Sequence, residues 1–166
     1  MKRKAFGPST IAIHGEAGAR AVADPIAAAI FQSSTFVAPF GPADDVLYTR
    51  YGNNPNQLRL AERLARLEGA EAAIFVGSGM GATALAHLAV LQPGDHILSS
   101  AWIYGGTRKL FTEEFARLGI ETTFVASREL GAWQRAIRPD TRLLFGESVG
   151  NPSVDVLDVP AIAVSV

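Results

Sequence analysis

Cysteine is absent from this chain of 166 residues, which excludes disulfides, thiolate catalysis and thiolate metal sites. An excess of charge is also missing, because the net charge is -1, and nothing favours nucleic acid or an anionic membrane as a partner. No apolar run approaches the about 18 residues of a membrane span. The basic start, MKRK, is not followed by the unbroken apolar stretch of a signal peptide. We therefore expect a cytoplasmic α/β protein.

Histidine and lysine are scarce. The three histidines, His14, His87 and His96, have no metal-like spacing and no acidic partner in register, so we expect no metal site. The only lysines are Lys2, Lys4 and Lys109, which limits any chemistry that requires an amine.

A glycine-rich stretch stands at the centre of the chain. Residues 72–76, AAIFV, are predicted to form a buried strand, and residues 82–91 are strong helix formers. Gly77-Ser-Gly-Met-Gly81 lies between them. Glycines let the backbone approach an anion, and the unpaired amides at a helix start point towards it. The stretch is typical of a phosphate-binding turn.

The remaining pattern alternates strands and helices. We expect strands at residues 96–100, 120–126 and 142–147, and helices at residues 55–68, 107–118, 130–137 and from Ala161. This order favours a largely parallel sheet with right-handed crossovers. Only one turn of the last helix fits before Val166, so we interpret the chain as a truncated piece of a larger fold.

The first part of the chain lacks strong periodicity. Proline and glycine recur through residues 1–47, which predicts an extended arm with one short strand at residues 30–37. Asn54 and Pro55 are a favoured cap and first residue for the helix at residues 55–68. We therefore divide the chain into an arm, residues 1–54, that packs on a neighbouring subunit, and an incomplete domain, residues 55–166.

The glycine turn alone has two interpretations. Gly77-Ser-Gly-Met-Gly81-Ala also fits the GxGxxG/A pattern of nicotinamide dinucleotide-binding proteins, which requires an acidic residue at the end of the next strand. That strand ends in Ser99 and Ser100, and the pattern begins far from the N-terminus. The neighbouring segments therefore decide between the two.

Four segments occur in order with suitable spacing. They are Tyr48-Thr-Arg-Tyr-Gly-Asn, Val76-Gly-Ser-Gly-Met-Gly-Ala, Tyr104-Gly-Gly-Thr and Glu147-Ser-x-x-Asn-Pro. Together they closely resemble the Cys/Met-metabolism family of pyridoxal-phosphate enzymes, which includes cystathionine γ-synthase, cystathionine lyases, methionine γ-lyase and O-acetylhomoserine sulfhydrylase. The resemblance implies an N-terminal arm and the first part of a fold-type I (aspartate aminotransferase-like) large domain.

The resemblance also implies roles for individual residues. Ser78, Gly79 and Met80 would hold the cofactor phosphate, where the plain alternative is a tight strand-to-helix turn. Tyr104 would stack on the pyridine ring as the one catalytic residue, rather than being a half-buried core tyrosine. Asn151 would donate a hydrogen bond to the phenolic oxygen, rather than only form an Asn-Pro turn.

Two further residues would act across a subunit interface. Tyr48 and Arg50 would reach the phosphate bound by a neighbour, because a planar guanidinium can hold two oxygens; the alternative for Arg50 is a solvated turn. Glu147 is expected to shape the site rather than react. Val149 and Gly150 depart from the Pro-Thr or Pro-Ala usual in the family, which affects the path of the loop that carries Asn151.

The implied reaction needs a lysine for the Schiff base and an acid on the pyridine nitrogen. In the family both follow the Glu147 strand, and none of the three lysines matches. The resemblance thus implies elimination or γ-replacement on cystathionine, methionine or O-acyl-homoserine by a tetramer built from dimers, with this chain inactive alone. A second hypothesis is a cofactor-free remnant that acts as an interaction subunit.

Overall fold

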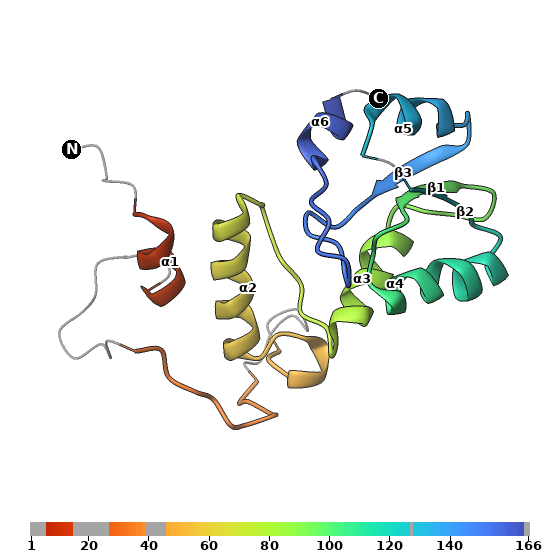
Figure 1. Cartoon of the computed structure of the whole chain (residues 1–166). Helices are drawn as coiled ribbons and strands as arrows, with labels where there is room; N and C mark the ends of the chain where they lie inside the picture. The colour runs from red at the N-terminus through yellow and green to blue at the C-terminus, as the bar shows by residue number, and fades with distance from the viewer. Residues whose placement is uncertain (1–5, 15–26, 39–45, 127, 165–166) are drawn as a thin grey trace. The chain divides into compact units, whose positions relative to one another are not determined.

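The computed structural model describes residues 6–14, 27–38, 46–126 and 128–164. The chain divides into two compact units, Met1–Phe75 and Val76–Val166, drawn from red to yellow and from green to blue in Figure 1. Lys2, Lys4 and much of the expected arm lie outside the described residues. Among the residues that are described, no helix is long and apolar enough to cross a membrane.

Unit 1 is built on helix α2, Pro55–Glu68, which has the predicted bounds. The side chain of Asn54 accepts a hydrogen bond from the amide of Asn56, and the side chain of Gln57 accepts one from the amide of Asn54. These two bonds satisfy amides that a helix start otherwise leaves open. Gly69 ends the helix in the left-handed conformation, at φ 67°, where glycine carries no steric cost.

The prediction for the segment before α2 was wrong in two respects. A helix, α1 (Pro8–His14), packs against α2 where an extended arm was expected. The strand expected at residues 30–37 is reduced to an isolated antiparallel bridge between Thr35 and Tyr48. A helix of two turns depends on packing for its stability, so the local pattern gave little sign of it. The short helix η2, Thr49–Tyr51, follows the bridge.

Unit 2 contains a parallel sheet, as predicted. Its strands are β1 (His96–Ser100), β2 (Glu121–Val125) and β3 (Thr141–Phe145), and their order is β2-β1-β3. Every residue of β1 is buried, because this central strand has a neighbour on each side and side chains over both faces. Its Ile97 packs with one apolar cluster and its Leu98 with the other.

The helices of unit 2 confirm the expected alternation. They are α3 (Gly79–Leu88), α4 (Gly105–Lys109), α5 (Leu130–Ala136) and α6 (Val159–Val164). Helix α3 begins three residues before the expected start at Ala82, because Ser78 caps it. The helix expected at residues 107–118 begins at Gly105 and continues after α4 as the π-helix η3, Leu110–Phe115.

The strand expected at residues 72–76 is absent. This segment has no strand assignment, and Ile74 is 77% exposed. None of the three strands in the described sheet pairs with it. A strand exists only when a neighbour satisfies its amides and carbonyls, so five apolar residues alone did not suffice to predict one.

Candidate cofactor-binding site

Helix α3 presents open backbone amides at its first turn. The hydroxyl of Ser78 accepts a hydrogen bond from the amide of Gly81 at 3.0 Å. Within the described residues, the amides of Gly79 and Met80 have no partner. A Cβ at Gly77 or Gly79 would meet no atom within 4 Å. The turn therefore leaves room for an anion over two free donors, as a phosphate site requires.

The end of α3 is fixed in the core. The buried His87 ring lies 5.0 Å from the ring centroids of Phe111 and Phe145, and its Nδ1 lies 2.6 Å from the carbonyl oxygen of Thr83. Helix α3 also packs against α4. The glycine turn thus stands at the free end of a helix whose other end is held between η3 and β3.

Tyr104 lies in the loop that follows β1 and precedes α4. Its amide donates a hydrogen bond to Oε1 of Glu147, which follows β3, at 2.9 Å. The two loops meet because the carboxyl ends of neighbouring parallel strands lie at one edge of the sheet. The Tyr104 side chain is half exposed, so its ring can contact a ligand. Glu147 shapes this loop by holding the amide.

Asn151 lies in the loop after β3, and its side chain is exposed. Val149 and Val156 form an antiparallel bridge at the base of the loop. The amide of Val154 donates to the carbonyl of Gly150 at 2.9 Å, which closes a turn around Asn151 and its cis peptide bond to Pro152. The loop therefore presents Asn151 at the same edge of the sheet as Tyr104.

A close contact explains why position 150 is glycine, where the resemblance leads us to expect threonine or alanine. Gly150 is buried, and a Cβ there would lie 2.7 Å from the carbonyl oxygen of Trp102. The loop after β3 therefore packs directly on the backbone of the loop after β1. A residue with a side chain at this position requires a different loop path.

Tyr48 and Arg50 belong to unit 1. The guanidinium carbon of Arg50 lies 6.0 Å from the centroid of the Tyr48 ring. The segment is ordered by asparagines: Asn53 accepts from the Tyr48 amide at 2.7 Å, and Asn54 donates to Thr49 Oγ1 at 3.0 Å. Arg50 itself is exposed and able to bind an anion.

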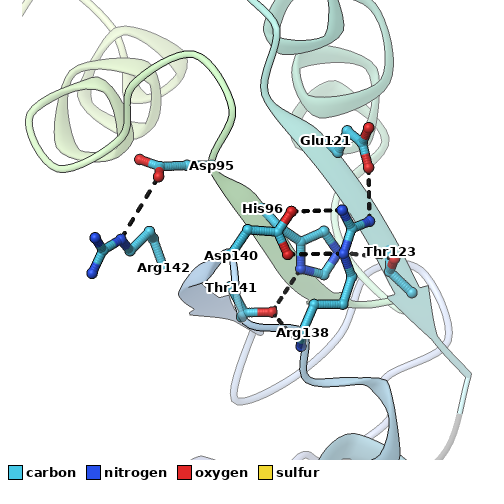
Figure 2. Close-up of polar contacts among 8 residues, drawn as sticks. All are labelled: Asp95, His96, Glu121, Thr123, Arg138, Asp140, Thr141 and Arg142. Atoms are coloured by element: carbon cyan, nitrogen blue, oxygen red, sulfur yellow. Dashed lines mark hydrogen bonds and ion pairs between the residues drawn. The ribbon is translucent and has the colours of Figure 1, made fainter.

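A second polar cluster lies at the amino ends of the strands (Figure 2). The His96 ring is fully buried, with Nδ1 2.8 Å from Thr141 Oγ1 and Nε2 2.9 Å from Thr123 Oγ1. Arg138 donates to Asp140 at 2.6 Å and to Glu121 at 2.7 Å. These groups satisfy one another, so we assign the cluster a structural role in joining the three strands.

The pKa values in this cluster are displaced for reasons that the contacts explain. Burial, together with the nearby Arg138 guanidinium, lowers the pKa of His96 because both disfavour the charged form of the ring. Hydrogen bonds from Arg138 lower the pKa of Asp140. The sequence pattern did not single out this histidine, because its two threonine partners are 27 and 45 residues away.

Sequence reasoning also missed residues that shape the site edge. Gly106 lies beneath the Tyr104 ring: a Cβ there would lie 2.4 Å from Cε1 of Tyr104. Arg128 pairs with Asp155 and lies over the indole of Trp102. Among these residues, Gly106 alone had a sequence signal, which is the double glycine that follows Tyr104. The Lys109 side chain faces solvent, and its Nζ lies 3.7 Å from Oε2 of Glu113.

The dinucleotide interpretation lacks its acidic residue in the structure. Strand β1 ends in Ser99 and Ser100, and both side chains are buried. The Ser99 hydroxyl donates to the carbonyl of Ser100 and the Ser100 hydroxyl accepts from the amide of Trp102. Neither residue can supply the carboxylate that binds a ribose.

Comparison with known proteins gives a consistent result. The model of the family described as Cys/Met metabolism PLP-dependent enzyme matches residues 9–166. An L-methionine gamma-lyase from Porphyromonas gingivalis is 38% identical over 165 aligned residues, which cover 94% of this chain and 41% of that protein. An O-acetyl-L-homoserine sulfhydrylase from Corynebacterium glutamicum is 40% identical over 146 residues, covering 81% of this chain and 33% of that protein.

Solved structures agree with these relatives. The metB structure from Corynebacterium glutamicum has a TM-score of 0.85 and 33% identity over 96% of this chain and 42% of its own. A putative O-acetylhomoserine (thiol)-lyase from Campylobacter jejuni, solved with a pyridoxyl-lysine monophosphate, has a TM-score of 0.81 and 28% identity, covering 97% of this chain and 41% of its own. This chain therefore spans about two fifths of the length of most of these proteins.

Proposed function

Since this chain belongs to the Cys/Met metabolism family of PLP-dependent enzymes, we propose that it forms the phosphate- and ring-binding part of such an enzyme. The reaction is elimination or γ-replacement on a sulfur amino acid or an O-acylhomoserine. The relatives named above include a methionine lyase and a sulfhydrylase, which supports this substrate class without choosing between the two reactions.

One observation carries the proposal: the free amides of Gly79 and Met80 at the start of α3, beneath open space. Two backbone donors at the positive end of a helix suit a dianionic phosphate. The Ser78 hydroxyl accepts a hydrogen bond from the Gly81 amide, which holds the turn in shape, and its own O–H donates to the phosphate beside the two amides.

The other residues orient the cofactor and limit its motion. The half-exposed ring of Tyr104 would supply a flat face for the pyridine ring of the cofactor. The side-chain amide of Asn151 would donate a hydrogen bond to the phenolic oxygen of the cofactor. PLP, when bound, supplies an electron sink for the pair of electrons left when the substrate α-proton is removed. The described residues of this chain provide the binding surface for that chemistry.

Residues 1–54 act as an arm in this proposal and residues 55–166 as part of the large domain. The exposed Arg50, with Tyr48 beside it, binds the phosphate held by a second subunit in a dimer, and two dimers form a tetramer. A guanidinium is suited to this because it can place two donors on one phosphate.

Direct titration of the purified chain with PLP tests the proposal. The substitution Gly79→Glu places a carboxylate over the anion site without a clash, because a Cβ at Gly79 meets open space. Repulsion of the phosphate should weaken PLP binding about tenfold or more. Ala86→Glu is the matched control, since Ala86 is exposed on the same helix far from its start. Equal affinity of the two variants, or binding of NAD in place of PLP, would contradict the proposal.

A further inference from the structure

Three loops at one edge of the sheet are joined by a single group of side chains. Trp102 follows β1, Arg128 follows β2 and Asp155 lies in the loop after β3. We infer that Arg128 is a positioning residue for Asn151: by binding Asp155 against Trp102 it fixes the loop that presents the Asn151 side chain. This inference rests on the proposed function, since the role of Asn151 in cofactor binding is part of it.

The side-chain contacts link all three loops. Nη2 of Arg128 forms an ion pair with Oδ1 of Asp155. The guanidinium carbon lies 5.7 Å from the centroid of the Trp102 ring, within the range of a cation–π contact. The Asp155 side chain is only 19% exposed, so its carboxylate is largely withdrawn from water and depends on this partner.

The backbone transmits this restraint to Asn151. The carbonyl of Asp155 accepts the amide of Gly150 at 2.7 Å, and the carbonyl of Gly150 accepts the amide of Val154 at 2.9 Å. Gly150 also packs on the carbonyl of Trp102. Asn151 directly follows Gly150 and lies inside this closed turn, so holding Asp155 holds the residue before Asn151 in place.

Arginine is better suited to this task than lysine. An exposed ion pair alone contributes little, and the Arg128 side chain is 61% exposed. A planar guanidinium can pair with the carboxylate through its edge while its face lies on the indole, which an ammonium cannot do. Arg128→Lys should therefore keep the charge and lose part of the order in the loop.

The test compares Arg128→Gln, Asp155→Asn and Arg128→Lys in the full chain. Arg117→Gln serves as the control, because the Arg117 side chain is exposed like that of Arg128 and also pairs with a carboxylate, the exposed Glu114, on the helix after Tyr104, away from this loop. Amide hydrogen exchange at Gly150 and Val154 reports the order of the loop. Titrations with PLP and with inorganic phosphate separate the ring end of the site from the phosphate end.

We expect amide exchange at Gly150 and Val154 to become about tenfold faster in Arg128→Gln and Asp155→Asn. PLP affinity should fall about threefold or more while phosphate affinity stays unchanged, with Arg128→Lys intermediate and the control unaffected. Unchanged exchange, or faster exchange with unchanged PLP affinity, would overturn the inference. Failure of the unsubstituted chain to bind PLP would instead contradict the proposed function, and amide exchange would still decide whether Arg128 fixes the loop.

Discussion

The ring of Tyr104 lies directly over Gly106, so closely that a Cβ at Gly106 would be 2.4 Å from Cε1 of the tyrosine. The position of the proposed stacking ring therefore depends on the absence of a side chain two residues later. The neighbouring Gly105 has no such contact, because a Cβ there meets no atom within 4 Å.

Replacement of Gly106 by alanine should displace the Tyr104 ring. Both glycines lie in the first turn of α4, outside the left-handed region, where alanine adopts the same backbone angles, so neither Gly106→Ala nor Gly105→Ala should unfold the chain. Loss of ring stacking should weaken PLP binding about two- to tenfold in Gly106→Ala alone. Fluorescence titration of the two variants checks this, and an equal loss of affinity in both would show that the ring position does not matter.

Replacement of Gly150 by alanine should destabilise unit 2. The added Cβ would press on the carbonyl of Trp102 at 2.7 Å, and the strain should cost about 1–3 kcal/mol in the free energy of unfolding. Urea unfolding followed by tryptophan fluorescence measures this cost. Gly77→Ala, which places its Cβ in open space, should leave the midpoint nearly unchanged. If Gly150→Ala is as stable as the parent chain, the two loops do not pack as described.

The stability of the chain should fall below about pH 6.5 because of His96. Burial lowers the pKa of His96 in the folded state, whereas in the unfolded state it stays near 6.5. As the pH falls through about 6.5, His96 binds a proton in the unfolded state before it does so in the folded state. One such proton changes the free energy of unfolding by up to about 1.4 kcal/mol per pH unit.

Urea midpoints between pH 5 and pH 8 test this expectation. His96→Gln removes the titrating group and keeps an amide that can bond to Thr123 and Thr141. This variant should be less stable at pH 8 and should have a flatter pH dependence between pH 7 and pH 5. Asp140, whose pKa is lowered by Arg138, contributes stability that is lost only below its ordinary value of 3.8. The same slope in both proteins would exclude His96 as the source.

Elements set by local chemistry could be predicted from the sequence. The bounds of α2 follow from Asn54, Pro55 and Gly69, which stand at the two ends of the helix. Strand β1 has the predicted bounds, and all its residues are buried. Elements that depend on distant partners could not. The segment 72–76 has the composition of a strand and lacks a neighbour in the described sheet, and the π-helix η3 has no sequence signature.

The candidate site shows the same division between local and distant information. The glycine turn and its cap Ser78 lie within a few residues, and so the open amides of Gly79 and Met80 could be anticipated. The contact of Arg128 with Asp155 joins residues 27 apart in different loops, which no local spacing reveals. The roles of Tyr48, Arg50, Tyr104 and Asn151 towards the cofactor stay predictions until binding is measured.

Asn54 performs two tasks that substitution can separate. Its Oδ1 caps α2 through the Asn56 amide at 2.9 Å, and its Nδ2 donates to the carbonyl of Ser33 and to Thr49 Oγ1, each at 3.0 Å. Asn54→Asp keeps the acceptor and loses both donors, whereas Asn54→Ala loses all three bonds. Loss of the cap should cost about 1 kcal/mol in Asn54→Ala, seen as faster exchange of the Leu58 amide, which bonds to the Asn54 carbonyl.

Both substitutions should loosen the segment that carries Arg50. The Thr49 amide donates to Ser34 at 3.0 Å, next to the two contacts that Nδ2 makes, so its exchange should accelerate equally in the Asp and Ala variants. Only the Ala variant should also affect Leu58. If the Thr49 amide stays protected in both, the bridge between Thr35 and Tyr48 holds this segment without Asn54. In that case the pairing of Thr35 with Tyr48, and not Asn54, would hold Arg50 in place.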